Sequence, residues 1–374
     1  SAPSFNKRAS DMIYRLLAAS LVFTSLAAGA EREFYKGADI SLLQTIEDRG
    51  GVYKEDGQAK DPLLIFQGNG CNAMRIRLFH TPTGEPPRVN SLDYTKKLGR
   101  RIKDAGLKLM LDIHYSDTWA DPGKQTKPAA WEKLSFEELV EAVRVYTEEV
   151  IVEMCQAGAA PDWVQVGNEI APGMLWPDGR VGTPEQWEKL ATLLKAGIAG
   201  VHAGRGDRSI GTIIHLHCGG SPEQTARYFD YLKQHDVNYD IIGLSYYPWW
   251  HSRGLGFAPL KENLKASIER FGKDIMVVET AYPWYPNCED STQLLHRGER
   301  RPLVPGLPAS KESQKEYLEQ IIQVAREAPE GRCVGLFYWA PEYIPTPRLR
   351  PGRGHLSLFD EEGNALPGMR AFRK

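Results

Sequence analysis

The sequence contains few cysteines and no cysteine pattern. Only five occur in 374 residues, at positions 71, 155, 218, 288 and 333, and no two are spaced as C-x-x-C. The paired-cysteine spacings of zinc sites are therefore absent. The count leaves room for one or two disulfides, but at least one thiol has no partner within the chain.

The charge is balanced, and the chain has no internal repeat, low-complexity segment or break in composition. It carries 46 basic and 48 acidic side chains, a formal net charge of -2 at pH 7. Nucleic-acid-binding proteins usually carry a marked excess of basic residues. We therefore expect one domain and no nucleic-acid partner.

Long apolar runs are missing except near the N-terminus. There, Lys7 and Arg8 precede the apolar run 16–28, which ends at the small residues 28–30, AGA. This order predicts a secretory signal in residues 1–30. A membrane anchor is the alternative, but the run is shorter than the roughly 20 residues that a spanning helix needs. We expect the mature chain, 31–374, to be exported to the periplasm or beyond, without membrane attachment.

Eight apolar segments rich in β-branched residues alternate with helical patterns. Two helices begin with a Thr or Ser cap followed by Pro and Glu, at 183–185 and 221–223. Such alternation is typical of parallel βα units. The sequence therefore predicts an α/β fold, a single-domain (β/α)8 TIM barrel over 31–374. The expected strands are 34–41, 73–79, 108–115, 162–166, 209–217, 239–248, 274–282 and 333–340.

Two glutamates follow apolar strands in equivalent contexts. Glu169 ends the fourth expected strand and Glu279 the seventh, and the C-terminal ends of barrel strands carry the chemistry of this fold. A retaining glycosidase needs one carboxylic acid as proton donor and one carboxylate as nucleophile, roughly 5–5.5 Å apart. Asn168, next to Glu169, could bind a sugar 2-OH. The spacing alone does not say which glutamate is the acid.

Other polar and aromatic residues are expected at the same end of the barrel. Arg77 would hold the nucleophile ionised through a charge-assisted hydrogen bond, and Tyr246 would donate a hydrogen bond to a carboxylate. Trp339 would form a sugar platform, and Trp249 and Trp250 lie in a predicted loop, where side chains are less often core.

A metal-dependent hydrolase is an alternative, because His215 and His217 form a His-x-His pair. Metal-dependent hydrolases on this barrel carry that pair on the first strand, where this chain offers only Asp39. We therefore expect no catalytic metal.

With these residues in hand, the chain resembles glycoside hydrolase family 53, the endo-β-1,4-galactanases. The resemblance implies that Glu169 is the acid/base, Glu279 the nucleophile and Asn168 the partner of the 2-OH. It further implies the substrate-binding or supporting residues Arg77, His114, Tyr246, Trp119, Trp249, Trp339 and Asp39. The matching segments are GADIS (37–41), RIRLF (75–79), LDIHYSDTWADPGKQTKPAAW (111–131), VQVGNEIAPGMLWPDGR (164–180), IGLSYYPWWH (242–251), VVETAYPW (277–284) and FDEEGNALP (359–367).

The expected function is retaining hydrolysis of β-1,4-galactosidic bonds in the galactan or arabinogalactan side chains of pectin. The expected partner is the polysaccharide alone, with no cofactor and a monomeric chain. A structural calcium ion stays open but has no support in the sequence, because the stretch 345–353 departs from the family pattern; the loop 80–94 departs from it as well. Two alternatives stay open: the same mechanism on another β-linked polysaccharide, and a non-catalytic polysaccharide-binding barrel, which would need no carboxylate pair.

Overall fold

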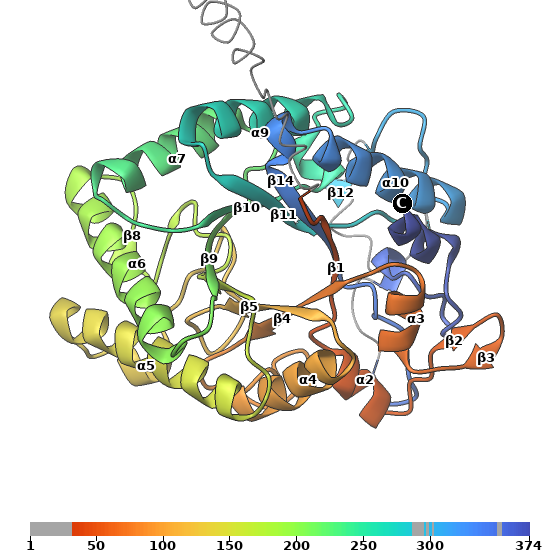
Figure 1. Cartoon of the computed structure of the whole chain (residues 1–374), viewed down its shortest axis with the longest axis horizontal. Helices are drawn as coiled ribbons and strands as arrows, with labels where there is room; N and C mark the ends of the chain where they lie inside the picture. The colour runs from red at the N-terminus through yellow and green to blue at the C-terminus, as the bar shows by residue number, and fades with distance from the viewer. Residues whose placement is uncertain (1–31, 286–294, 297–298, 301–302, 350–353) are drawn as a thin grey trace, which may run out of the picture. The chain divides into compact units, whose positions relative to one another are not determined.

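Eight parallel strands close into a barrel, as Figure 1 shows. The order around the barrel is β1-β14-β11-β10-β9-β6-β5-β4. Barrel strands that follow one another in the sequence are therefore hydrogen-bonded neighbours, and the last strand pairs with the first. This confirms the predicted (β/α)8 fold. The barrel strands are β1 (Tyr35–Asp39), β4 (Ala73–Leu78), β5 (Lys108–Ile113), β6 (Trp163–Val166), β9 (Gly211–Leu216), β10 (Ile241–Ser245), β11 (Asp274–Thr280) and β14 (Cys333–Trp339).

The computed structural model describes residues 32–285, 295–296, 299–300, 303–349 and 354–374. The predicted secretory signal and Cys288 lie outside these ranges. Cys71, Cys155, Cys218 and Cys333, the four cysteines within them, are all free thiols. In the parts of the chain described, no helix has both the length and the apolar composition to cross a membrane.

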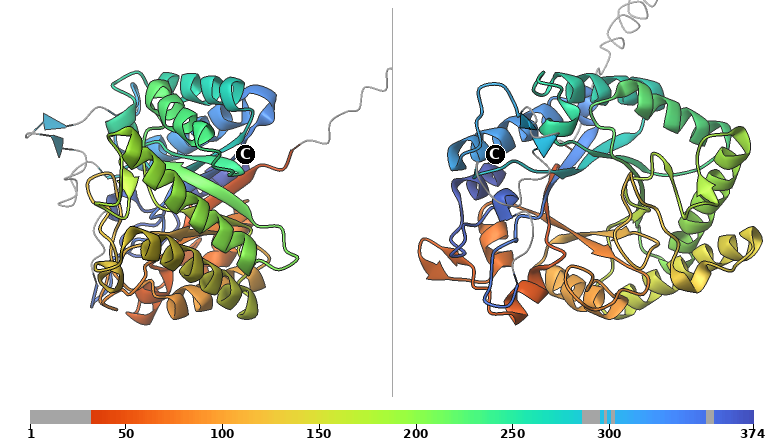
Figure 2. Two further views of the ribbon diagram at one scale, coloured as in Figure 1. Left: turned by 90° about the vertical axis from the view of Figure 1, so that its left-hand side faces the viewer. Right: turned by 180° about the vertical axis from the view of Figure 1, so that it is seen from behind.

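Helices cover the outside of the barrel, as the two views in Figure 2 show. The predicted cap at Thr183 is present as a capping box with Gln186, and Ser221 caps its helix through the backbone N–H of Gln224. These caps satisfy N–H groups that the first helical turn leaves unpaired. The helices are α2 (Leu43–Asp48), α3 (Pro62–Gly68), α4 (Leu92–Asp104), α5 (Phe136–Gln156), α6 (Pro184–Gly204), α7 (Pro222–Gln234), α8 (Pro248–His251), α9 (Ala258–Phe271) and α10 (Lys311–Arg326).

Short hairpins supplement the barrel. The segment between β1 and β4 contains a hairpin of β2 (Lys54–Glu55) and β3 (Gln58–Ala59). A second hairpin, β7 (Gly173–Met174) with β8 (Gly179–Arg180), follows β6, and a third pairs β12 (Leu295–His296) with β13 (Glu299–Arg300).

The inside of the barrel changes from apolar to polar along the strands. One buried cluster includes Ala73, Met110, Trp163 and Ile213 from four neighbouring strands. Two residues further along each of these strands, on the same face, the side chain is polar and buried: Arg75, Asp112, Gln165 and His215. The apolar layer therefore closes one end of the barrel, and the polar layer lies beneath the end where the strands finish.

We predict that Gly37→Ala destabilises the barrel. A Cβ at Gly37 would lie 2.2 and 2.3 Å from two ring carbons of Phe337. That ring is completely buried, and side chains in a close-packed interior have little room to shift. Overpacking of this kind lowers the free energy of unfolding by about 1–3 kcal/mol, which thermal denaturation will report as a lower Tm.

The matched control is Gly68→Ala in α3, where a Cβ would meet only the Lys60 Nζ atom, at 3.8 Å. This variant should keep or slightly raise the Tm, because Ala is the better helix former. Equal Tm values for the two variants would contradict the packing argument.

Candidate active site

A cleft of about 1020 Å³ opens at the C-terminal ends of the barrel strands. Among the residues predicted for the site, Asn168, Glu169, Glu279, Arg77, His114, Trp119 and Trp339 line this cleft. Asp39, Tyr246 and Trp249 are buried and lie outside its lining. The two glutamates predicted to carry the chemistry therefore share one cavity.

Glu169 sits where β6 turns into a loop. Gly167 and Glu169 both have positive φ angles, 92° and 50°, and a non-glycine residue in this region is uncommon and strained. The Ser245 hydroxyl donates a hydrogen bond of 2.7 Å to Glu169 Oε1. Burial raises the pKa of Glu169 well above the ordinary glutamate value, and the neighbouring charge of Glu279 raises it further. The carboxyl group is therefore biased toward its protonated form.

Glu279 differs from Glu169 in having a hydrogen-bond donor at each carboxyl oxygen. Burial, together with the charges of Asp112 and Asp39, raises its pKa above the ordinary glutamate value, and the Arg75 guanidinium and the Tyr247 hydroxyl oppose this rise. Arg75 Nη2 lies 2.9 Å from Glu279 Oε1, and Tyr247 donates a 2.8 Å hydrogen bond to Oε2. Since both oxygens face donors, Glu279 ionises before Glu169 does.

A bulge in the sheet directs Glu279 into the barrel. Leu244 pairs with Val277, but the next residue, Ser245, pairs with Glu279, so β11 contains one residue more than β10 at this point. An extra residue reverses the alternation of faces downstream. Val278 and Glu279 therefore both point inward.

Arg75 is the centre of the polar layer. Its side chain is 1% exposed. Burial alone would lower the pKa of its guanidinium, but the nearby carboxylates more than reverse this effect, so the cation persists. Its partners are Asp39 Oδ2 at 2.5 Å, Gln165 Oε1 at 2.7 Å, Asp112 Oδ2 at 2.8 Å, Glu279 Oε1 at 2.9 Å and Asn168 Oδ1 at 3.0 Å.

The structure corrects the place predicted for Arg77. Both arginines lie on the inner face of β4, but Arg77 is two residues, about 6.6 Å, nearer the mouth, and Glu279 meets the deeper Arg75. Arg77 instead donates from Nε to Asn90 Oδ1, and its guanidinium carbon lies 4.0 Å from the centre of the Trp119 ring. Arg77 thus supports an aromatic wall of the cleft.

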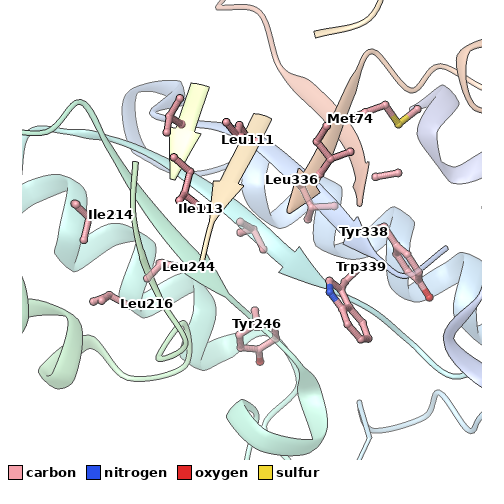
Figure 3. Packing of buried hydrophobic residues seen from close by; sticks show 14 of the residues in the cluster. Met74, Leu111, Ile113, Ile214, Leu216, Leu244, Tyr246, Leu336, Tyr338 and Trp339 are labelled. Carbon is pink, nitrogen blue, oxygen red and sulfur yellow. The ribbon is translucent and has the colours of Figure 1, made fainter. Parts of the chain in front are cut away.

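The structure also corrects the place predicted for Tyr246. Its hydroxyl donates to the Gly256 carbonyl, and Figure 3 shows its side chain in the same buried cluster as Leu216 and Leu244. Alternation along β10 puts Ser245 and Tyr247 on the inner face and Tyr246 on the outer one. The predicted bond from a tyrosine to a carboxylate is therefore made by Tyr247.

Several aromatic rings line the cleft. Trp339 lies between Trp119 and Tyr343, with ring centres 6.4 and 5.9 Å away. Trp249, predicted to lie in a loop, falls in the short helix α8 and is 3% exposed. Its neighbour Trp250 is 41% exposed and lines the cleft instead.

The remaining predicted residues support the polar layer. Asp39 accepts from Arg75 and from the Ser41 hydroxyl, so it lies beneath the cleft rather than on its surface. His114 Nδ1 accepts from the Ala120 N–H at 3.0 Å, and its Nε2 lies 3.0 Å from Asp112 Oδ2. Asn168 donates from Nδ2 to the Ala120 carbonyl at 2.8 Å.

The His-x-His pair does not form a metal site with its surroundings. His215 Nδ1 contacts Gln165 Nε2, and its Nε2 contacts Ser245 Oγ, both at 2.8 Å. His217 lines the cleft one step nearer the mouth. Within the described ranges, no three or more His, Cys, Asp or Glu side chains are grouped so that they could hold a metal ion.

Sequence reasoning missed Arg75, Ser245 and Tyr247, which contact the two glutamates directly. For Ser245 and Tyr247 a signal was available, because both are in phase with the apolar residue Ile241 at the start of the same strand. The choice between Arg75 and Arg77 had no such signal, since both arginines occupy inner positions and differ only in depth.

Comparisons with known proteins agree on one family. A family model described as glycosyl hydrolase family 53 matches residues 35–372. An uncharacterized protein in the bgaB 5' region of Niallia circulans is 43% identical over 354 residues, 92% of this chain and 94% of that protein. The arabinogalactan endo-beta-1,4-galactanase of Cellvibrio japonicus is 33% identical over 378 residues, 96% of each chain.

A solved structure leads to the same family. The GH53 catalytic domain of Ignisphaera aggregans superposes with a TM-score of 0.83 at 33% identity, over 92% of this chain and 97% of that one. The predicted resemblance is therefore confirmed: the chain belongs to glycosyl hydrolase family 53 and is a glycoside hydrolase.

Proposed function

We propose that the protein is a retaining endo-β-1,4-galactanase that cleaves the galactan or arabinogalactan side chains of pectin. The observation that carries the mechanism is the different surroundings of two carboxyl groups in one cleft. Both oxygens of Glu279 face donors, Arg75 and Tyr247, whereas burial and the charge of Glu279 favour the protonated form of Glu169. The substrate is suggested by the name of the relative from Cellvibrio japonicus, an arabinogalactan endo-beta-1,4-galactanase.

The reaction proceeds in two displacements. In the first, a Glu279 oxygen attacks the anomeric carbon while the bond to the departing sugar oxygen breaks and Glu169 gives that oxygen its proton. In the second, Glu169 takes a proton from water, which attacks the anomeric carbon and releases Glu279. Two inversions return the original configuration.

The surrounding residues support the nucleophile and bind the sugar. Arg75 and Tyr247 stabilise the Glu279 carboxylate before attack and again when it departs. Asn168 is held by Arg75 and Ala120, and its second N–H is available for the sugar 2-OH, a contact that strengthens in the transition state. Trp119, Trp339 and Trp250 provide faces on which sugar rings can stack.

Export of the mature chain belongs to the proposal and rests on the pattern of residues 1–30 alone. We expect the exported protein to be a monomer that begins near residue 31, which N-terminal sequencing and light scattering of the secreted protein will check.

The substrate and stereochemistry can be tested together. The purified enzyme should release galacto-oligosaccharides from β-1,4-galactan and act much more slowly on β-mannan and β-glucan. Proton NMR of the first products should show the β-anomer before mutarotation. Preference for another glycan would overturn the substrate, and an initial α-anomer would overturn the mechanism.

We predict that Glu279→Gln lowers kcat on galactan by roughly 10³-fold or more, because an amide oxygen is a far weaker nucleophile than a carboxylate. The matched control is Glu262→Gln on the exposed side of α9, which should retain full activity. Circular dichroism melts of both variants will separate lost chemistry from lost folding. Near-normal turnover by Glu279→Gln would contradict the assignment.

A second prediction concerns pH. The Tyr247 hydroxyl lowers the pKa of Glu279, so Tyr247→Phe should raise that pKa. Because the free enzyme needs an ionised Glu279, the acidic limb of the kcat/KM profile should move to higher pH. Tyr246→Phe, which removes the adjacent hydroxyl bonded to Gly256, should leave the limb where it is. Identical profiles for both variants would refute the role of Tyr247.

A further inference from the structure

Glu169 and Arg75 are joined by an unbroken chain of hydrogen bonds through the barrel interior. Arg75 Nε meets Gln165 Oε1 at 2.7 Å, and Gln165 Nε2 meets His215 Nδ1 at 2.8 Å. His215 Nε2 then meets Ser245 Oγ at 2.8 Å, and Ser245 meets Glu169 Oε1 at 2.7 Å. Gln165, His215 and Ser245 are each 0% exposed, so water does not compete for these bonds.

Arg75, at one end of this series of hydrogen bonds, fixes the orientation of the Gln165 amide. A guanidinium group can only donate, so the Gln165 oxygen accepts from Arg75 and its amide nitrogen faces away. That nitrogen also lies 3.2 Å from Asp112 Oδ1. Turning the amide over would set nitrogen against guanidinium and oxygen against carboxylate. The orientation of Gln165 is therefore determined at both of its ends.

The orientation of Gln165 fixes the tautomer of His215. Its Nδ1 faces the Gln165 amide donor and also the backbone N–H of Glu169, at 3.4 Å, so Nδ1 carries no proton. Burial, followed by the charge of Arg75, lowers the pKa of His215 well below the ordinary histidine value. The ring is therefore neutral with its single proton on Nε2, and it donates to Ser245.

The tautomer of His215 then decides where the catalytic proton can reside. Because Ser245 Oγ accepts from His215, its own O–H points to Glu169 Oε1. An oxygen that accepts this bond is a poor place for a proton. In the part of the chain described, Glu169 Oε2 meets no protein donor or acceptor, so the proton of the acid form is left on that oxygen.

We propose that Gln165, His215 and Ser245 are positioning residues that keep the acid proton of Glu169 on Oε2, ready for the departing sugar oxygen. This inference rests on the proposed function. No proton moves along the chain during the reaction. The direction of its bonds, set at Arg75, holds Oε1 as an acceptor, whether Glu169 is the acid or the carboxylate of the second step.

The test measures how strongly each variant depends on the leaving group. In aryl β-1,4-galactobiosides, a phenyl leaving group needs the proton of Glu169, whereas a dinitrophenyl group departs without it. Ser245→Ala should lower kcat/KM for the phenyl substrate by about tenfold and for the dinitrophenyl substrate by less than about twofold. Ser245→Thr keeps a hydroxyl and should restore most of the lost rate.

His215→Phe extends the test beyond Ser245. It leaves the serine in place but removes the donor that orients it, so the Ser245 hydroxyl can turn and accept a hydrogen bond from a protonated Glu169 Oε1 instead. This variant should show the same selective loss on the phenyl substrate. The matched control is Thr280→Val, which removes another buried hydroxyl, one that donates to the Tyr246 carbonyl outside the cleft. It should change both substrates equally.

The outcomes are distinct. Equal losses on both substrates for Ser245→Ala, or a wild-type leaving-group dependence in His215→Phe, would overturn the proposal. A wild-type enzyme that hydrolyses a different aryl β-glycoside series would overturn only the substrate, and the same comparison would then use that series. A wild-type enzyme that forms no glycosyl-enzyme with any dinitrophenyl glycoside would overturn the proposed function itself.

Discussion

The polar half of the barrel depends on one buried cation. Arg75 contacts Asp39, Asp112 and Glu279 while almost completely removed from water. Each of these charges alone would be strongly unfavourable at such depth, and removing one partner of a buried ion pair generally costs 3–5 kcal/mol. The arginine and its carboxylates must therefore be present together. Contact with this cation favours the ionised form of Glu279 inside the barrel, against the opposing effects of burial and of the charges of Asp112 and Asp39.

The same cation makes the two glutamates chemically different. Arg75 touches Glu279 directly, whereas at Glu169 burial and the charge of Glu279 raise the pKa by more than Arg75 lowers it. An ionised Glu279 then disfavours a second negative charge nearby. Thus one guanidinium group, placed nearer one carboxyl than the other, separates a nucleophile from an acid without any difference in residue type.

Much of the fold and part of the site could be predicted from the sequence, and the exceptions have physical causes. Strand and helix periodicity, together with caps such as Thr183, locate the elements, so Glu169 and Glu279 could be placed at strand ends. The depth of each arginine within the barrel could not be predicted from the sequence, because Arg75 and Arg77 lie on the same face of one strand. The bulge that turns Glu279 inward could not be predicted either, because an extra residue within an apolar run does not change the apolar pattern of the sequence.

The two layers of the barrel interior solve a conflict between stability and chemistry. Polar groups such as Gln165 and His215 contribute little apolar burial, and a network that is only partly bonded is worse than an apolar core. In this barrel the apolar layer below the polar one contains packed aromatic rings, including Trp163 and Phe337. Because that layer supplies hydrophobic stability independently, the upper layer is free to satisfy hydrogen bonds in one fixed direction. A rigid polar network is then compatible with a strained residue such as Glu169, whose positive φ the surrounding structure must hold.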